Sequence, residues 1–108
     1  MLVLFDQGTP VGIREFLDKH TVKTAREQGW STLLNGDLLR EAEVAGFEVL
    51  LTTDKNLVYQ QNLTRRKIAI VALSYARWSL IQSVMARVVE AIDMAKPGTY
   101  TLVEVPRQ

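Results

Sequence analysis

Cysteine is absent from this chain, and histidine occurs only once in its 108 residues. The lack of thiols excludes disulfides and thiolate metal sites, and a single histidine does not favour a zinc site. A metal would therefore have to bind through oxygen atoms, which are the ligands that Mg²⁺ and Mn²⁺ prefer.

Long apolar runs and an excess of one charge are also missing. No stretch approaches the roughly 18 apolar residues of a membrane span, and the apolar start of the chain is short and lacks the basic leader of a signal peptide. We therefore expect no membrane partner and a cytoplasmic location. The net charge of +1 does not by itself indicate a nucleic-acid binder, so any such binding would have to come from local basic patches.

Hydrophobic residues make up 47% of the chain, which is enough for the core of one domain over residues 1–108. Apolar runs alternate along the chain with segments of helical periodicity. The expected strands cover residues 2–5, 20–23, 48–52, 68–73 and 99–105. The expected helices cover residues 10–19, 37–45, 57–61 and 78–95, with one helical turn at 25–28. This order predicts an α/β fold with three layers, α/β/α, and a mostly parallel sheet of about five strands.

Acidic residues follow two of the expected strands. Asp6 ends the first strand and Asp54 follows the third, and ligands of open α/β sheets bind at the carboxyl ends of the strands. Asp37 opens a helix near the same edge, and Glu41 lies one turn later on the same face of that helix. Carboxylates brought together repel one another unless a cation neutralises them. These acids therefore predict a Mg²⁺ or Mn²⁺ site that activates water against a phosphodiester.

Each of these acids also has a purely structural interpretation. Asp is common after strands because it favours turns and helix caps. Asp37 competes with Asn35 as the N-cap of its helix, and Glu41 can be a solvated helix residue. Their joint arrival at one edge of the sheet is what favours a metal site.

Basic residues that could contact a phosphate occur in two places, a cluster at 65–67 and a single arginine, Arg77. Arg65 and Arg66, with Lys55 nearby in the sequence, belong to the densest basic cluster and are candidate contacts to a phosphate backbone. A solvated loop is the alternative for that cluster. Arg77 follows the strand expected at 68–73, at the same edge as the acids, and is a further candidate for holding a phosphate.

Three short motifs occur within residues 1–95: Leu4-Phe5-Asp6-Gln7-Gly8-Thr9-Pro10, Asn35-Gly36-Asp37-Leu38-Leu39 and Leu51-Thr52-Thr53-Asp54-Lys55-Asn56-Leu57. In their order and spacing, these motifs resemble the PIN-like nuclease superfamily, and in particular its small members related to the toxin ribonucleases of bacterial toxin–antitoxin pairs. The similarity covers about residues 1–95.

The resemblance implies a PIN-like fold, a Mg²⁺ or Mn²⁺ cofactor and cleavage of RNA, with an antitoxin protein as a further partner. It carries over Asp6, Asp37 and Asp54 as the catalytic and metal-binding acids. Asn56 and Glu41 are additional candidate metal ligands.

The motifs depart from the family pattern at three positions. Gln7 and Gly8 stand where the small relatives usually have Glu and Asn, and Asn56 stands where they usually have a second Asp. Because Gln7 and Asn56 each remove a negative charge, these departures bear on metal affinity. The sequence thus predicts a metal-dependent ribonuclease, and a catalytically impaired PIN-like module that binds RNA or protein is the alternative. A third interpretation is a flavodoxin-like or receiver-like module that only shares acids at its strand ends.

The helix expected at 78–95 carries more apolar residues than one core-facing stripe needs. Trp78, Leu80, Val84 and Val89 are the surplus. Such a surface predicts a homodimer or a protein partner.

Overall fold

The computed structural model describes residues 1–54 and 66–107, so the helix expected at 57–61 lies outside the described residues. Its five strands form one sheet in which all neighbours are parallel. The predicted α/β class and parallel sheet are therefore confirmed. The strands are β1 (Leu2–Phe5), β2 (Thr21–Thr24), β3 (Val49–Thr52), β4 (Ala69–Leu73) and β5 (Tyr100–Val103).

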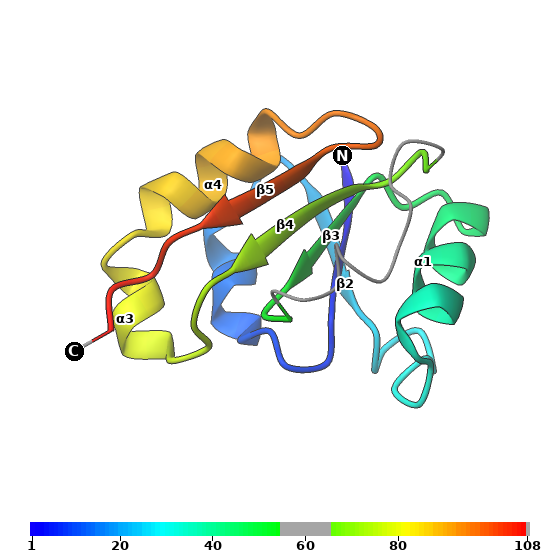
Figure 1. Ribbon diagram of the computed structural model, residues 1–108, viewed down its shortest axis with the longest axis horizontal. Helices are drawn as coiled ribbons and strands as arrows, with labels where there is room; N and C mark the ends of the chain where they lie inside the picture. The colour runs from blue at the N-terminus through cyan, green and yellow to red at the C-terminus, as the bar shows by residue number, and fades with distance from the viewer. Residues whose placement is uncertain (55–65, 108) are drawn as a thin grey trace.

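Helices cover both faces of the sheet, as Figure 1 shows. They are the 3-10 helix η1 (Val11–Phe16) and the α-helices α1 (Asn35–Val44), α3 (Trp78–Gln82) and α4 (Met85–Asp93). Side chains alternate between the faces along each strand. In β1, Val3 and Phe5 join the core under η1, α3 and α4, whereas Leu4 joins the core under α1. The chain therefore has three layers.

The strand order is β2-β1-β3-β4-β5, which places β2 and β5 at the edges. Every residue of β3 and β4 is buried, as expected for parallel strands covered on both faces. The chain leaves β1 toward β2 and then crosses back to β3 on the other side of β1. In doubly wound sheets with this order, ligands bind at the carboxyl ends of the strands that flank such a reversal. The ends of β1 and β3 are thus the place where a site is expected.

The α-helix expected at 10–19 is wrong, because the structure has the shorter 3-10 helix η1 there. Thr9 does not cap this helix. It is buried, and its hydroxyl donates to the carbonyl oxygen of Leu51 at 3.0 Å. A Cβ atom on Gly12 would lie 2.7 Å from the Trp78 ring, so Gly12 allows that ring to pack directly on η1. Trp78 is therefore a packing residue.

The single helix expected at 78–95 is also wrong, because α3 and α4 are separated at residues 83–84. The Ser83 hydroxyl donates to the carbonyl oxygen of Leu80 at 2.6 Å, a local bond that competes with regular helical pairing. The apolar residues that we expected in surplus on this helix lie partly buried against the core: Trp78, Leu80, Val84 and Val89.

Two glycines end helical segments as the sequence predicts. Gly29 closes the turn at 25–29 with φ +78°, and Gly46 follows α1 with φ +89°. Both positions are in the left-handed region that favours glycine. Among the helices of residues 1–54 and 66–107, none has the length and apolar character that crossing a membrane requires.

Candidate active site at the carboxyl ends of β1 and β3

Asp6 is the first residue after β1, and two uncharged donors hold its carboxylate. The backbone N–H of Gln7 donates to Oδ1 at 2.6 Å, and the hydroxyl of Thr52 donates to Oδ2 at 2.7 Å. The backbone N–H of Asp6 donates to the carbonyl oxygen of Leu51 at 3.0 Å. No basic side chain in the described part of the chain pairs with this carboxylate. Asp6 is thus fixed in position without a salt bridge to a basic side chain of residues 1–54 or 66–107.

Thr52 joins the ends of β1 and β3. Its side chain is fully buried, and its hydroxyl oxygen accepts the backbone N–H of Asp54 at 3.0 Å while donating to Asp6. A single hydroxyl group therefore connects the Asp6 carboxylate with the Asp54 backbone. The two acids that the sequence places after strands belong to neighbouring strands, and both are partly buried.

A small hollow opens beside Asp6, with a volume of about 180 Å³. Its walls come from the end of β1, the start of η1 and the end of β2. The lining residues are Asp6, Gln7, Thr9, Val11, Thr24 and Arg26. An acidic residue, Asp6, and a basic residue, Arg26, therefore both line this hollow.

A hard divalent cation fits the donors at this edge. Each oxygen of the Asp6 carboxylate accepts one protein hydrogen bond and keeps further lone-pair capacity. Mg²⁺ is usually bound through one or two carboxylates and keeps several of its waters, so Asp6 and Asp54 would be a sufficient protein contribution. Among the described residues, no group of three or more potential metal-ligating acids or histidines is found.

The helix acids lie apart from such a group. Asp37 is exposed on the first turn of α1 and pairs with Arg40 one turn later. Glu41 is exposed on the same helix. The N-cap of α1 is Leu34, so the expectation that Asp37 or Asn35 caps this helix is wrong, and Asp37 instead lies in the first turn, where the helix dipole favours an acid. Glu41 matches its structural interpretation as a solvated helix residue.

The basic cluster at 65–67 is only partly described, since Arg65 lies outside the described residues, as do Lys55 and Asn56. Arg66 precedes β4, at the amino end of the sheet, and donates to Glu43 of α1 at 2.7 Å. Burial raises the pKa of Glu43, but the Arg66 side chain and the Lys67 backbone N–H lower it more, so that this pKa is below its ordinary value. The salt bridge of Arg66 therefore has a structural role, because it links the segment before β4 to α1.

Arg77 lies where the sequence predicts a phosphate contact, after the carboxyl end of β4. It occupies the N-cap position of α3 and is exposed. Its backbone carbonyl oxygen accepts the N–H groups of Leu80 and Ile81 at 3.1 and 3.0 Å. Arg77 thus remains a candidate for substrate contact at this edge.

Two residues of the site were missed in the sequence: Thr52 and Arg26. Thr52 has the ordinary appearance of a β-branched strand residue, and no local signal marks its contact with Asp6. Arg26 could have been found, because Thr24 and Glu27 have the Thr-x-x-Glu spacing of a capping box, which fixes a turn directly after a strand.

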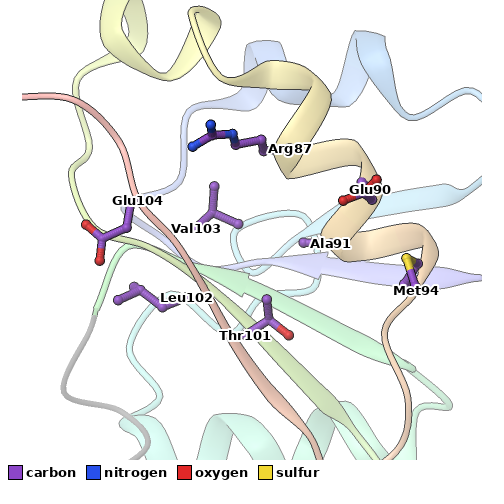
Figure 2. A pocket seen from close by; sticks show the side chains of 8 residues that line it. All are labelled: Arg87, Glu90, Ala91, Met94, Thr101, Leu102, Val103 and Glu104. Carbon is purple, nitrogen blue, oxygen red and sulfur yellow. The ribbon is translucent and has the colours of Figure 1, made fainter.

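Larger hollows lie over α4, away from the ends of β1 and β3 that carry Asp6 and Asp54. One of about 500 Å³ lies between α4 and β5 (Figure 2), and its lining includes Arg87, Glu90, Met94 and Leu102. Another of about 660 Å³ lies between α4 and Phe16. We consider the smaller hollow the better candidate for chemistry, because it combines a strand-end carboxylate with a basic group at the chain reversal.

Comparison with known proteins gives no matching family model. No curated protein and no solved structure is significantly similar to the chain. The assignment of a function therefore depends on the geometry at the ends of β1 and β3, and on the motifs that resemble the PIN-like superfamily.

Proposed function

We propose that the protein is a metal-dependent ribonuclease of PIN-like type, which hydrolyses RNA phosphodiesters with Mg²⁺ or Mn²⁺. The observation that carries this proposal is the Asp6–Thr52–Asp54 arrangement at the chain reversal. The carboxylate of Asp6 is held by hydrogen bonds but has no basic partner among the described residues. An ordered carboxylate of this kind is suited to bind a cation from solution.

Each residue has a distinct part in the proposed reaction. Asp6 and Asp54 would hold the metal, which when bound supplies an activated water and neutralises developing negative charge. Thr52 is a positioning residue, because its hydroxyl orients the Asp6 carboxylate and binds the Asp54 backbone. Thr9 fixes the loop after β1 by its bond to Leu51. These bonds hold the acids in place before substrate arrives, which is the general requirement for electrostatic catalysis.

The substitution Asp6→Asn tests the proposal. Asn can still accept the Thr52 hydroxyl, so the thermal unfolding midpoint should stay close to that of the wild type. Cleavage of a fluorescent single-stranded RNA of mixed sequence with Mn²⁺ should fall by about a hundredfold or more, since a charge acting on the transition state is lost. Glu90→Gln on α4 removes the same charge from an exposed position and should leave cleavage unchanged.

Titration calorimetry with Mn²⁺ separates this function from its alternative. The wild type should bind Mn²⁺, and the Asp6→Asn variant should bind it more weakly. An Asp6→Asn variant that keeps Mn²⁺-dependent cleavage would contradict the proposal. A wild type that binds RNA but neither binds Mn²⁺ nor cleaves would instead indicate the non-catalytic module.

A further inference from the structure

The turn after β2 carries an arginine into the hollow that contains Asp6. β2 pairs with β1 in a register that sets Thr24 beside Phe5, so the residues after Thr24 emerge next to Asp6. Arg26 and Asp6 both line the hollow. One acidic residue that follows β1 and one basic residue that follows β2 are therefore part of the same lining.

The backbone of this turn is held firmly by a capping box. The Thr24 hydroxyl accepts the N–H of Glu27 at 3.0 Å, and the Glu27 carboxylate accepts the N–H of Thr24 at 2.8 Å. Buried Ala25 donates its N–H to the Phe5 carbonyl oxygen at 2.9 Å. Reciprocal bonds of this kind restrict a turn to one conformation, so the Cα position of Arg26 is set before any ligand binds.

A second arginine fastens the turn to the neighbouring element. Arg14 of η1 donates to Glu27 at 2.6 Å. This bond is the main reason why the pKa of Glu27 is below its ordinary value, with the Thr24 backbone N–H as the next cause. Glu27, the acid next to Arg26 in the sequence, thus accepts hydrogen bonds from Arg14 and Thr24 and is already paired.

Arg26 itself has no carboxylate partner in residues 1–54 and 66–107. Four other arginines have a charged or aromatic partner. Three form salt bridges, Arg14 with Glu27, Arg40 with Asp37 and Arg66 with Glu43, and Arg107 lies over the Tyr75 ring. The positive charge of Arg26 is therefore available to an anion that enters the hollow. A guanidinium group presents paired N–H donors that match the oxygens of a phosphate.

We propose that Arg26 binds a non-bridging phosphate oxygen of the RNA backbone, opposite the metal side of the hollow at Asp6. The site would then recognise the ribose-phosphate chain and would have little preference for base sequence, because phosphate contacts carry no base information. This assignment rests on the proposed function, since RNA is the ligand that the function supplies.

The test compares Arg26→Gln with Arg87→Gln, which is the same substitution at an exposed position on the hollow of α4 and β5 (Figure 2). Strands β3 and β4 separate β5 from β1. Binding of a fluorescent single-stranded RNA of mixed sequence is measured by anisotropy in EDTA at several salt concentrations. Arg26→Gln should raise Kd by about tenfold and reduce the slope of log Kd against log salt by about 0.7. Arg87→Gln should change neither quantity.

The conservative variant Arg26→Lys distinguishes a charge contact from a structural role. It should restore the salt slope, because the charge returns, while affinity stays below the wild-type value, because the paired donors are lost. In the cleavage assay, Arg26→Gln should raise KM more than it lowers kcat, as expected for a contact present before the transition state.

The outcomes separate this inference from the function on which it rests. If Arg26→Gln and Arg87→Gln have the same Kd and salt slope, the role of Arg26 is contradicted, even when the wild type cleaves RNA. If Arg26→Gln weakens RNA binding as expected but the wild type has no Mn²⁺-dependent cleavage, the ribonuclease proposal fails and the phosphate contact of Arg26 stands.

Discussion

Asp6, at the carboxyl end of the parallel sheet, has partners of a different kind from those of Glu43 and Asp93, at the amino end. At the amino end, Glu43 pairs with Arg66 and accepts the backbone N–H of Lys67, and Asp93 accepts a hydrogen bond from His20 at 2.6 Å. At the carboxyl end, Asp6 accepts only the uncharged donors described above.

This difference teaches which acids the fold itself requires. Burying part of a carboxylate costs free energy unless the charge is compensated. For Glu43 and Asp93 the protein supplies that compensation, so these two acids link helices to the segments that precede strands. At the carboxyl end the described residues hold Asp6 in place but do not neutralise it, which is the arrangement expected when a ligand completes the site. Substitutions at the two ends should therefore affect different properties.

Thr52→Val should have the largest effect of the three substitutions that we use to test this contrast. It removes the donor to Asp6 and leaves the N–H of Asp54 without the acceptor recorded for it. The free energy of unfolding should fall by about 1–3 kcal/mol, measured by urea denaturation, and RNA cleavage should fall about tenfold. Thr101→Val at an exposed position of β5 is the matched control. Equal stability of the two variants would contradict the bridging role of Thr52.

Glu43→Gln tests the amino end and should change stability alone. The free energy of unfolding at neutral pH should fall by about 1–2 kcal/mol, because Arg66 loses its charged acceptor. The pKa of Glu43 is lowered below its ordinary value of 4.5 in the folded protein. Its contribution is therefore complete above about pH 4.5 and is lost as the pH falls through the lowered value.

Urea denaturation at several pH values measures this prediction. The stability difference between Glu43→Gln and wild type should shrink progressively below pH 4.5. Glu41→Gln, at an exposed position of the same helix, should show no such pH-dependent difference. If Glu43→Gln reduced RNA cleavage per folded molecule, the claim that Glu43 affects stability alone would be wrong.

The sheet and the position of its acids could be predicted because both depend on local pattern. Continuous apolar runs identify β1, β3 and β4, and a run that stops at Asp6 or just before Asp54 places each acid at a strand end. The pairing of β1 with β3 could not be predicted, because local sequence pattern does not determine the order of strands in a sheet. The order of the strands is what brings these two acids together.

Features that depend on contacts distant in the sequence could not be predicted. Thr9 has the sequence of a helix cap, yet its hydroxyl binds Leu51 of β3. Arg66 belongs to a basic run typical of a phosphate contact, yet its partner Glu43 lies on α1. In both cases a hydrogen bond to another element decides the role, and local propensity cannot report such a bond.

Met94→Ser should have the smallest effect and supplies the baseline for the comparison. Met94 directly follows α4 and is 69% exposed, so its side chain loses little apolar burial. The free energy of unfolding should change by less than about 0.5 kcal/mol, and RNA cleavage should stay unchanged. Ile92→Ser, two residues earlier and fully buried, should by contrast lose about 2–5 kcal/mol, the range for truncating a core side chain. A loss for Met94→Ser that grew with protein concentration would mean that a second copy covers this face of α4, because only association makes apparent stability depend on concentration.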